Sequence, residues 1–286
     1  MSERKLQTVI ESIHASDGAG VKLRRSLGGA RNLRIDPFLM LDEFYSDDPE
    51  DYLAGFPSHP HRGFETVTYM LDGHMRHEDS FGNRGDLGPG DVQWMTAAHG
   101  IIHSEMPQQT AGRMRGFQLW INLPAREKMK RAAWRDVPAR DIPTARLAGG
   151  GEARVIAGTL AQGDAVTRGP IQGMSTEPLY LDLRLPPDAT VSIPVASTHN
   201  AFLYAYEGEA SVGADDRTLP LHAAGMLSEG DNVRITAHTT GARLLLLAGR
   251  PIGEPIVQYG PFVMNSREEI EQAIADYQSG RLAVNP

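Results

Sequence analysis

The chain has 286 residues, of which 41% are hydrophobic, and this length allows two domains with buried cores. Its net charge of −8 argues against direct contact with the phosphate backbone of a nucleic acid. The absence of cysteine excludes disulfides, thiolate metal ligands and a cysteine nucleophile, so a metal site would need His, Asp or Glu ligands.

The N-terminal residues show no apolar signal segment. The longest apolar run, ARLLLLAG at 242–249, is strand-sized and far shorter than the ~20 residues of a membrane-spanning helix. We therefore expect a cytoplasmic protein without membrane association.

Short alternating segments separated by turn residues extend along most of the chain, which contains 30 Gly and 19 Pro. This pattern is typical of β-sandwiches and β-barrels. In chain order, we expect one set of strands and then a second set, at 65–71, 90–96, 116–124, 179–187, 200–212, 231–237 and 242–249.

The region between the two sets, residues 128–153, is rich in Pro, Arg and Gly and lacks sustained periodicity. We place a domain boundary here, with one domain at 1–135 and a second at 136–286. In each half, a strand ends in an acidic residue followed by glycine (Asp72-Gly73 and Glu207-Gly208), and a later strand opens with Gly-Asp. A duplicated barrel accounts for this weak repeat, although both pairs are also common turn signals.

The last expected element is a helix at about 266–279, because Ile270, Ala273, Ile274 and Tyr277 follow helical spacing. Ser266 followed by Glu269 fits a capping box, and a glycine at 280 stands at the expected C-terminal position. We expect this helix to cover a barrel face or rim and to have no catalytic role.

Two pairs of candidate metal ligands share the same spacing. His59 and His61 are two residues apart on a predicted strand, so they project from one face with Cα atoms about 6–7 Å apart. One such pair is weak evidence, because ten histidines in 286 residues give about 0.3 pairs by chance. His103 and Glu105 repeat the spacing, and we expect the two strands to face each other across a barrel. Three imidazoles and one carboxylate suit Fe(II), and also Mn, Co, Ni, Cu or Zn.

Glu65 competes with Glu105 for the carboxylate position, because it has the strand parity of His59 and His61 if no bulge intervenes. We expect mainly structural roles for the other histidines and for the large apolar residues near the candidate ligands. We expect His74 and His77 to lie in a turn, His99 to be structural, and the remaining histidines to lack a paired partner: His14, His199, His222 and His238. We assign Phe64, Trp94, Met95 and Trp120 to core packing, with one or two of them available to line a pocket.

The segment from His59 to Pro107, which contains HPHRGFETVTY and HSEMP, resembles the signature of the pirin family within the cupin superfamily. The segments 24–44 and 249–282 are similar to the family's opening and closing blocks, whereas about 135–175 is generic. One departure is TAAHG at 96–100, where the family pattern favours a glycine near position 98.

The resemblance implies an all-β bicupin: two cupin-type β-barrels with a short C-terminal α-helix. It also implies one divalent metal in the N-terminal barrel, with Fe(II) as the preferred ion and with His59, His61, His103 and Glu105 as ligands. This assignment prefers Glu105 over Glu65. The C-terminal barrel is expected to hold no metal.

The resemblance implies two alternative functions. In the first, the protein is a quercetin 2,3-dioxygenase that cleaves a flavonol with O2 and releases CO, with Glu105 as both ligand and proton acceptor. In the second, it is an iron-binding, redox-sensing regulator that binds a protein partner. Quercetin turnover as a side activity of an exposed metal also stays open. We expect a monomer that binds no nucleic acid directly.

Overall fold

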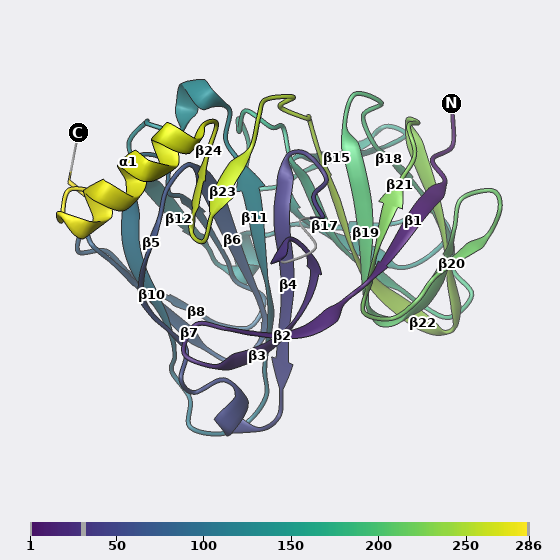
Figure 1. Ribbon diagram of the computed structural model, residues 1–286. Coiled ribbons are helices and arrows are strands. Elements are labelled where there is room, and N and C mark those ends of the chain that lie inside the picture. Colours follow the sequence, from purple (N-terminus) through teal and green to yellow (C-terminus); the bar gives the residue numbers. More distant parts are fainter. Residues whose placement is uncertain (1, 30–32, 285–286) are drawn as a thin grey trace. The chain divides into compact units, whose positions relative to one another are not determined.

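The computed structural model describes residues 2–29 and 33–284. Their contacts divide into two compact units, each built from β-strands (Figure 1). The N-terminal barrel comprises 14–25, 38–139 and 252–286, and the C-terminal barrel comprises 1–13, 26–37 and 140–251. Among the described residues, no helix has the length and apolar character needed to cross a membrane.

The N-terminal barrel contains a seven-stranded and a four-stranded antiparallel sheet. The larger sheet has the order β12 (Ala133–Val137), β9 (Val92–Thr96), β6 (Phe64–Asp72), β11 (Met114–Asn122), β4 (Phe38–Ser46), β3 (Val21–Leu27) and β2 (Ile13–Asp17). The smaller sheet has the order β5 (Phe56–His61), β10 (Ile101–Pro107), β7 (Met75–Asp79) and β8 (Arg84–Leu87). The two sheets face each other, since Trp120 on β11 contacts His61 on β5.

The C-terminal barrel is built on a nine-stranded antiparallel sheet. Its main order is β1 (Leu6–Glu11), β21 (Ala223–Leu227), β19 (Asn200–Val212), β22 (Asn232–Gly249), β17 (Leu179–Leu185), β14 (Glu152–Ala157) and β13 (Thr144–Arg146). Strand β18 (Thr190–Pro194) pairs with β22, β20 (Arg217–Leu219) pairs with β19, and a separate hairpin joins β15 (Thr159–Gln162) to β16 (Ala165–Arg168).

A cluster of aliphatic side chains forms the core of the C-terminal barrel. Alternate residues of the central strands contribute to it, including Leu181, Leu183 and Leu185 on β17 and Leu244 and Leu246 on β22. This alternation is the period of two that the sequence showed. These aliphatic side chains occupy the barrel core.

The compact units do not follow the predicted boundary at 135/136 throughout the chain. The chain passes from the main part of the N-terminal barrel to that of the C-terminal barrel at 139/140. Residues 1–13, however, belong to the C-terminal barrel, because β1 pairs with β21 and Leu6 joins the aliphatic core. Residues 252–286 belong to the N-terminal barrel. Linear sequence reasoning cannot detect such exchanges, because they depend on pairings between distant segments.

The C-terminal helix α1 (Arg267–Gln278) is confirmed close to its predicted bounds. Ser266 and Glu269 form both hydrogen bonds of the capping box. The helix buries Ile270 and Ala273 against Phe262 and Met264, and the latter two come from the hairpin of β23 (Val257–Tyr259) and β24 (Phe262–Met264). The helix thus covers part of the N-terminal barrel, to which Figure 1 shows it adjacent, coloured yellow.

The strands expected at 65–71, 90–96, 116–124, 179–187 and 200–212 correspond to β6, β9, β11, β17 and β19. The segments 231–237 and 242–249 were expected as two strands, but they form the single 18-residue strand β22. Its partner β19 shifts register between Ala205 and Glu207 and between Gly208 and Ala210, so the irregularity falls inside a continuous ladder. Three one-turn 3₁₀-helices, Pro49–Asp51, Ala125–Glu127 and Ala139–Asp141, complete the elements of the described residues.

Candidate metal centre

His59, His61 and His103 form a cluster in the smaller sheet of the N-terminal barrel. Strands β5 and β10 are antiparallel neighbours, and their register places His59 directly opposite His103. The expectation that the two ligand strands face each other across the barrel is therefore wrong: they are hydrogen-bonded neighbours in one sheet. Side chains directly opposite on one face approach to about 5 Å at Cβ, which explains the close contact between these rings.

The ring nitrogens of the three histidines converge. One ligand atom from each lies within 4.8 Å of the others. The Nε2 atoms of His59 and His61 are 3.0 Å apart, and the rings of His59 and His103 have centroids 4.3 Å apart. Metal–imidazole bonds are about 2.1 Å long, so two nitrogens that hold one ion would lie within about 4.2 Å of each other. The spacing therefore fits two adjacent ligands of one ion.

The surroundings favour the neutral imidazoles that a metal requires. Burial lowers the pKa of His61 and His103 well below the ordinary value, and the neighbouring imidazoles lower it further. The Nδ1 of His59 lies 2.8 Å from the Pro57 carbonyl oxygen, which can only accept, so this nitrogen donates and Nε2 keeps its lone pair. The buried His103 Nε2 has no hydrogen-bond partner among the described residues. These three imidazoles fit a metal ion.

Glu105 lies on the same strand as His103 but is held differently. The Thr68 hydroxyl donates to its Oε1 at 2.7 Å, and the Gln118 amide donates to its Oε2 at 2.9 Å. The atoms that lie within 4.8 Å of one another include all three histidines and not this carboxylate. Each oxygen accepts one bond from the opposite sheet and retains a lone pair for a further partner.

Glu65 faces away from this cluster. Strand β5 ends at His61, and Gly63, with φ +91°, separates it from β6. On β6, Thr68 reaches Glu105, so Glu65, three residues away, projects from the opposite face and accepts a bond from the Thr96 hydroxyl at 2.6 Å. The prediction that Glu65 shares the strand parity of the histidines required an uninterrupted strand, and the strand is interrupted at Gly63. Burial raises the pKa of Glu65 to about 7.

His77 is the residue near the centre that sequence reasoning missed. It was expected in a turn, but it lies on strand β7, opposite Glu105 in register, and is fully buried. Its Nδ1 lies 3.2 Å from the Nδ1 of His103. The alternation of Met75, His77 and Asp79 was the available signal, but the strand has only five residues and adjoins glycine-rich turns.

Other predicted residues lie outside the histidine cluster. His74 lies in the turn before β7, and the two ring nitrogens of His99 face the carbonyl oxygens of Lys130 and Val284. Phe64 and Trp120 pack in the barrel and also contact the ring of His61, with centroid distances of 5.1 and 5.3 Å. The centre thus has an aromatic wall on the side of His61.

The departure at position 98 has a structural consequence. Ala98 adopts φ +43°, a left-handed conformation that favours glycine, and its carbonyl accepts the Gly63 amide at 2.8 Å. The bend directly follows β9 and leads to the ligand strand β10. The sequence expectation of a glycine at this position therefore identified a real backbone requirement.

Comparisons with known proteins agree with this architecture. Residues 20–121 match the family model described as Pirin, and residues 180–283 match Pirin C-terminal cupin domain. A Pseudomonas aeruginosa protein named "Putative quercetin 2,3-dioxygenase" is 56% identical over 94% of this chain and 95% of its own length. A pirin-like protein of Caulobacter vibrioides is 50% identical over 98% of this chain and all of its own.

A crystal structure of quercetin 2,3-dioxygenase from Acinetobacter baumannii superimposes with a TM-score of 0.88 at 33% identity, covering 98% of this chain and 99% of the other. The expected all-β architecture of two cupin-type barrels with a C-terminal helix is thereby confirmed. With both family models matched and relatives similar over nearly its full length, this chain belongs to the pirin family.

Proposed function

We propose that the N-terminal barrel binds one divalent transition metal through His59, His61, His103 and Glu105 and cleaves a flavonol such as quercetin with O2, releasing CO. The observation that carries this proposal is the convergence of three buried or half-buried imidazoles, one with an unpartnered Nε2, beside a hydrogen-bonded carboxylate. The names of the similar proteins from P. aeruginosa and A. baumannii support the choice of reaction.

Fe(II) is the preferred ion, with Mn, Co, Ni, Cu or Zn as alternatives, because the proposed ligands are three nitrogens and one oxygen. When bound, the metal supplies Lewis-acid and electron-transfer chemistry to the substrate and O2. The absence of thiolate ligands leaves the centre without the soft donors that select Cu(I) or iron–sulfur clusters.

Glu105 has two parts in the proposal: it is a metal ligand, and it accepts the proton of the flavonol 3-hydroxyl group. Both its oxygens already accept hydrogen bonds from neutral donors, Thr68 and Gln118, which orient the carboxylate. The lone pairs that remain serve the metal and the substrate proton. Removal of this proton makes the substrate electron-rich enough to react with O2.

The half-buried Trp120, which packs on the fully buried Phe64, is the aromatic side chain available to contact a flat substrate. The rings of Phe64 and Trp120 lie within contact of each other, 4.3 Å between centroids, and both flank His61. Aromatic faces pack well against the fused rings of a flavonol, and their apolar surface excludes water from the reaction.

The experiment measures quercetin loss and CO release by protein that is purified without chelators and analysed for its metal content. We expect O2-dependent turnover with a metal-to-protein ratio near one, and loss of both metal and turnover in His59→Ala. A His59→Ala protein that still binds metal stoichiometrically would overturn the ligand assignment. Absence of turnover with Fe, Mn, Co, Ni and Cu would overturn the reaction.

A further inference from the structure

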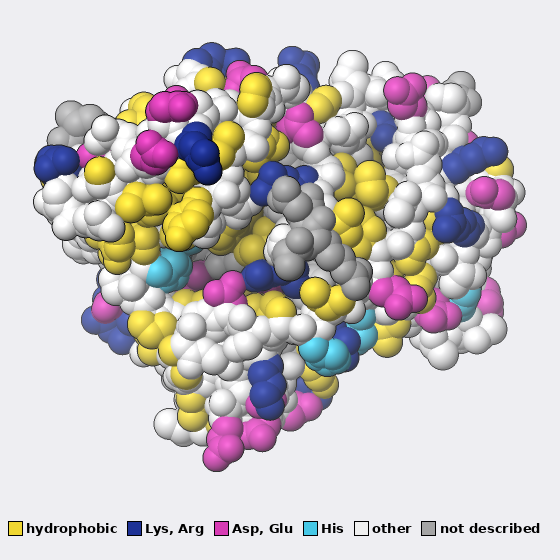
Figure 2. All heavy atoms as spheres, in the orientation of Figure 1, with side chains coloured by type: hydrophobic (Ala, Val, Ile, Leu, Met, Phe, Trp, Pro, Cys, Tyr) yellow, Lys and Arg dark blue, Asp and Glu magenta, His cyan; other side chains and the backbone are white. Residues whose placement is uncertain are grey.

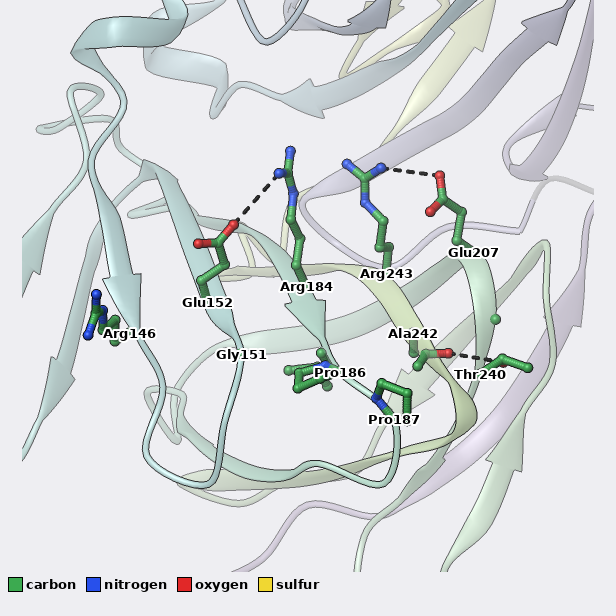
Figure 3. Close-up of a pocket in the computed structure, with 13 residues that line it drawn as sticks. Arg146, Gly151, Glu152, Arg184, Pro186, Pro187, Glu207, Thr240, Ala242 and Arg243 are labelled. Carbon is green, nitrogen blue, oxygen red and sulfur yellow. Dashed lines mark hydrogen bonds and ion pairs between the residues drawn. The ribbon is translucent and has the colours of Figure 1, made fainter.

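The C-terminal barrel carries a charged cavity on the outer face of its nine-stranded sheet. The cavity has a volume of about 540 Å³, within the range of small-molecule sites. Its charged lining consists of three arginines and two glutamates, and turn residues including Pro186 form its apolar edge (Figure 3). It lies entirely within residues 146–243 and contains none of the proposed metal ligands.

The five charged residues form one continuous row across five neighbouring strands. The register pairs Arg146 with Glu152, Glu152 with Arg184, Arg184 with Arg243, and Arg243 with Glu207. Residues paired in this way lie on the same face of a sheet. The adjoining residues on β17 and β22 point into the aliphatic core, so the row projects away from it.

Arg184 and Arg243 stand directly opposite each other, and such like-charged pairs destabilise a sheet. Their ion pairs run outward: Arg184 lies 3.6 Å from Glu152, and Arg243 lies 3.2 Å from Glu207. Figure 3 shows both guanidinium groups on the same side of the sheet, each joined to the glutamate on its outer flank. Neither glutamate stands between the arginines, and the row carries one excess positive charge.

Arg243 packs against the ring of Tyr206, which fixes its position. Its guanidinium lies over the ring of Tyr206, 5.0 Å from the centroid, and the Tyr206 hydroxyl donates to the buried Asp182. The buried Nε of Arg243 has no hydrogen-bond partner among the described residues. The site therefore presents a guanidinium that Tyr206 holds in position.

Two glycines, Gly208 and Gly241, leave space in the cavity beside the row of charged residues. Gly208 has φ +64°, and a Cβ atom there would lie 2.1 Å from the Gly241 carbonyl oxygen. Glycine is thus required for the close approach of the two strands, and both glycines line the cavity without side chains.

We propose that the space between Arg184 and Arg243 binds the carboxylate or phosphate group of a small anionic molecule. Two guanidinium groups present planar pairs of N–H donors that match the oxygens of either group, and a bound anion would offset the like-charge repulsion. The apolar edge accommodates the uncharged part of the molecule. This site is independent of the metal centre and of the reaction proposed there.

The test is isothermal titration of the full-length, metal-loaded protein with succinate and, separately, with inorganic phosphate, at constant ionic strength set with NaCl. We expect saturable binding of at least one anion at one site per chain; the anion that binds identifies the oxyanion class. Arg184→Gln and Arg243→Gln each weaken binding about tenfold or more. Arg168→Gln, an exposed arginine of the same barrel, leaves it unchanged.

Variants are compared only after circular dichroism and thermal melting show a folded protein, and Arg243→Lys, which keeps the charge, serves as the second variant. We expect Arg243→Lys to weaken binding because an ammonium group lacks the planar fork. Absence of saturable binding by both anions would overturn the proposal. Equal binding by wild type and the Arg184→Gln/Arg243→Gln double variant would overturn it as well.

Discussion

The Nδ1 atoms of His77 and His103 lie 3.2 Å apart, deep in the N-terminal barrel. If His103 binds a metal through Nε2, its proton must reside on Nδ1, where it is donated to His77. His77 thus fixes both the tautomer and the ring orientation of a proposed ligand without belonging to the ligand cluster.

Replacement of His77 by Phe is therefore expected to weaken metal affinity 10- to 100-fold, as the loss of such a supporting partner does in other metal sites. Competition with a chelator measures the affinity. The control is His74→Asn in the preceding turn, which should bind metal as wild type does. His77→Gln, which keeps an acceptor near His103, should restore part of the affinity. Unchanged affinity in His77→Phe would contradict this role.

The variant Glu105→Gln distinguishes the proposed role of Glu105 as proton acceptor from its proposed role as metal ligand. The amide keeps the shape of the side chain but cannot accept the substrate proton as a carboxylate does, so we expect kcat for quercetin to fall about 10²- to 10⁴-fold. Three imidazoles remain, and we expect the variant to retain measurable metal, unlike His59→Ala. Metal analysis and steady-state kinetics provide the two readouts, and wild-type kcat in Glu105→Gln would refute the proposed base.

Glu65 makes stability depend on pH. Its pKa is raised to about 7 in the folded protein from an ordinary value of 4.5, so its protonated form favours folding below pH 4.5. This contribution to the free energy of unfolding is lost as the pH rises from 4.5 to about 7. In that range Glu65 is ionised in the unfolded chain but still largely protonated in the folded protein. A difference of 2.5 pKa units corresponds to about 3 kcal/mol.

Urea denaturation of chelator-treated wild type and Glu65→Gln at pH 4.5 and pH 8 measures this effect. Relative to the variant, the wild type should lose up to about 3 kcal/mol of unfolding free energy between these pH values. Glu78→Gln, which alters an exposed carboxylate, serves as the control. A wild-type-minus-variant difference that does not change with pH would show that Glu65 ionises normally.

Ala98→Gly should stabilise the protein. Ala98 has φ +43°, where a Cβ atom is strained, and relief of that strain outweighs the greater flexibility of glycine in the unfolded chain. We expect a gain of about 0.5–1 kcal/mol in denaturant unfolding. Ala97→Gly, at the adjacent buried position, should instead destabilise the protein. A loss of stability in Ala98→Gly would contradict the strain argument.

On the face shown in Figure 2, acidic and basic side chains are interspersed, without a continuous basic patch.

The sequence alone predicted most of the fold and three residues of the cluster. Alternation over β6, β11 and β17 and the capping box of α1 are local signals, and they identified these elements because period and capping depend on neighbours in the chain. The spacing of His59 and His61 likewise indicated a shared face, and His103 was singled out because His103 and Glu105 repeat that spacing. The full set with Glu105 remains a proposal.

Only the tertiary structure decided what depends on pairing between distant strands. It placed β5 beside β10 in one sheet, turned Glu65 away from the histidines through the break at Gly63, and brought His77 against His103. It also assigned residues 1–13 to the C-terminal barrel and the C-terminal helix to the N-terminal barrel, although each is distant in sequence from most of that barrel. It placed Arg184 directly opposite Arg243. The hydrophobic pattern and turn geometry constrain register, but which distant strands pair is decided only when their buried faces pack together.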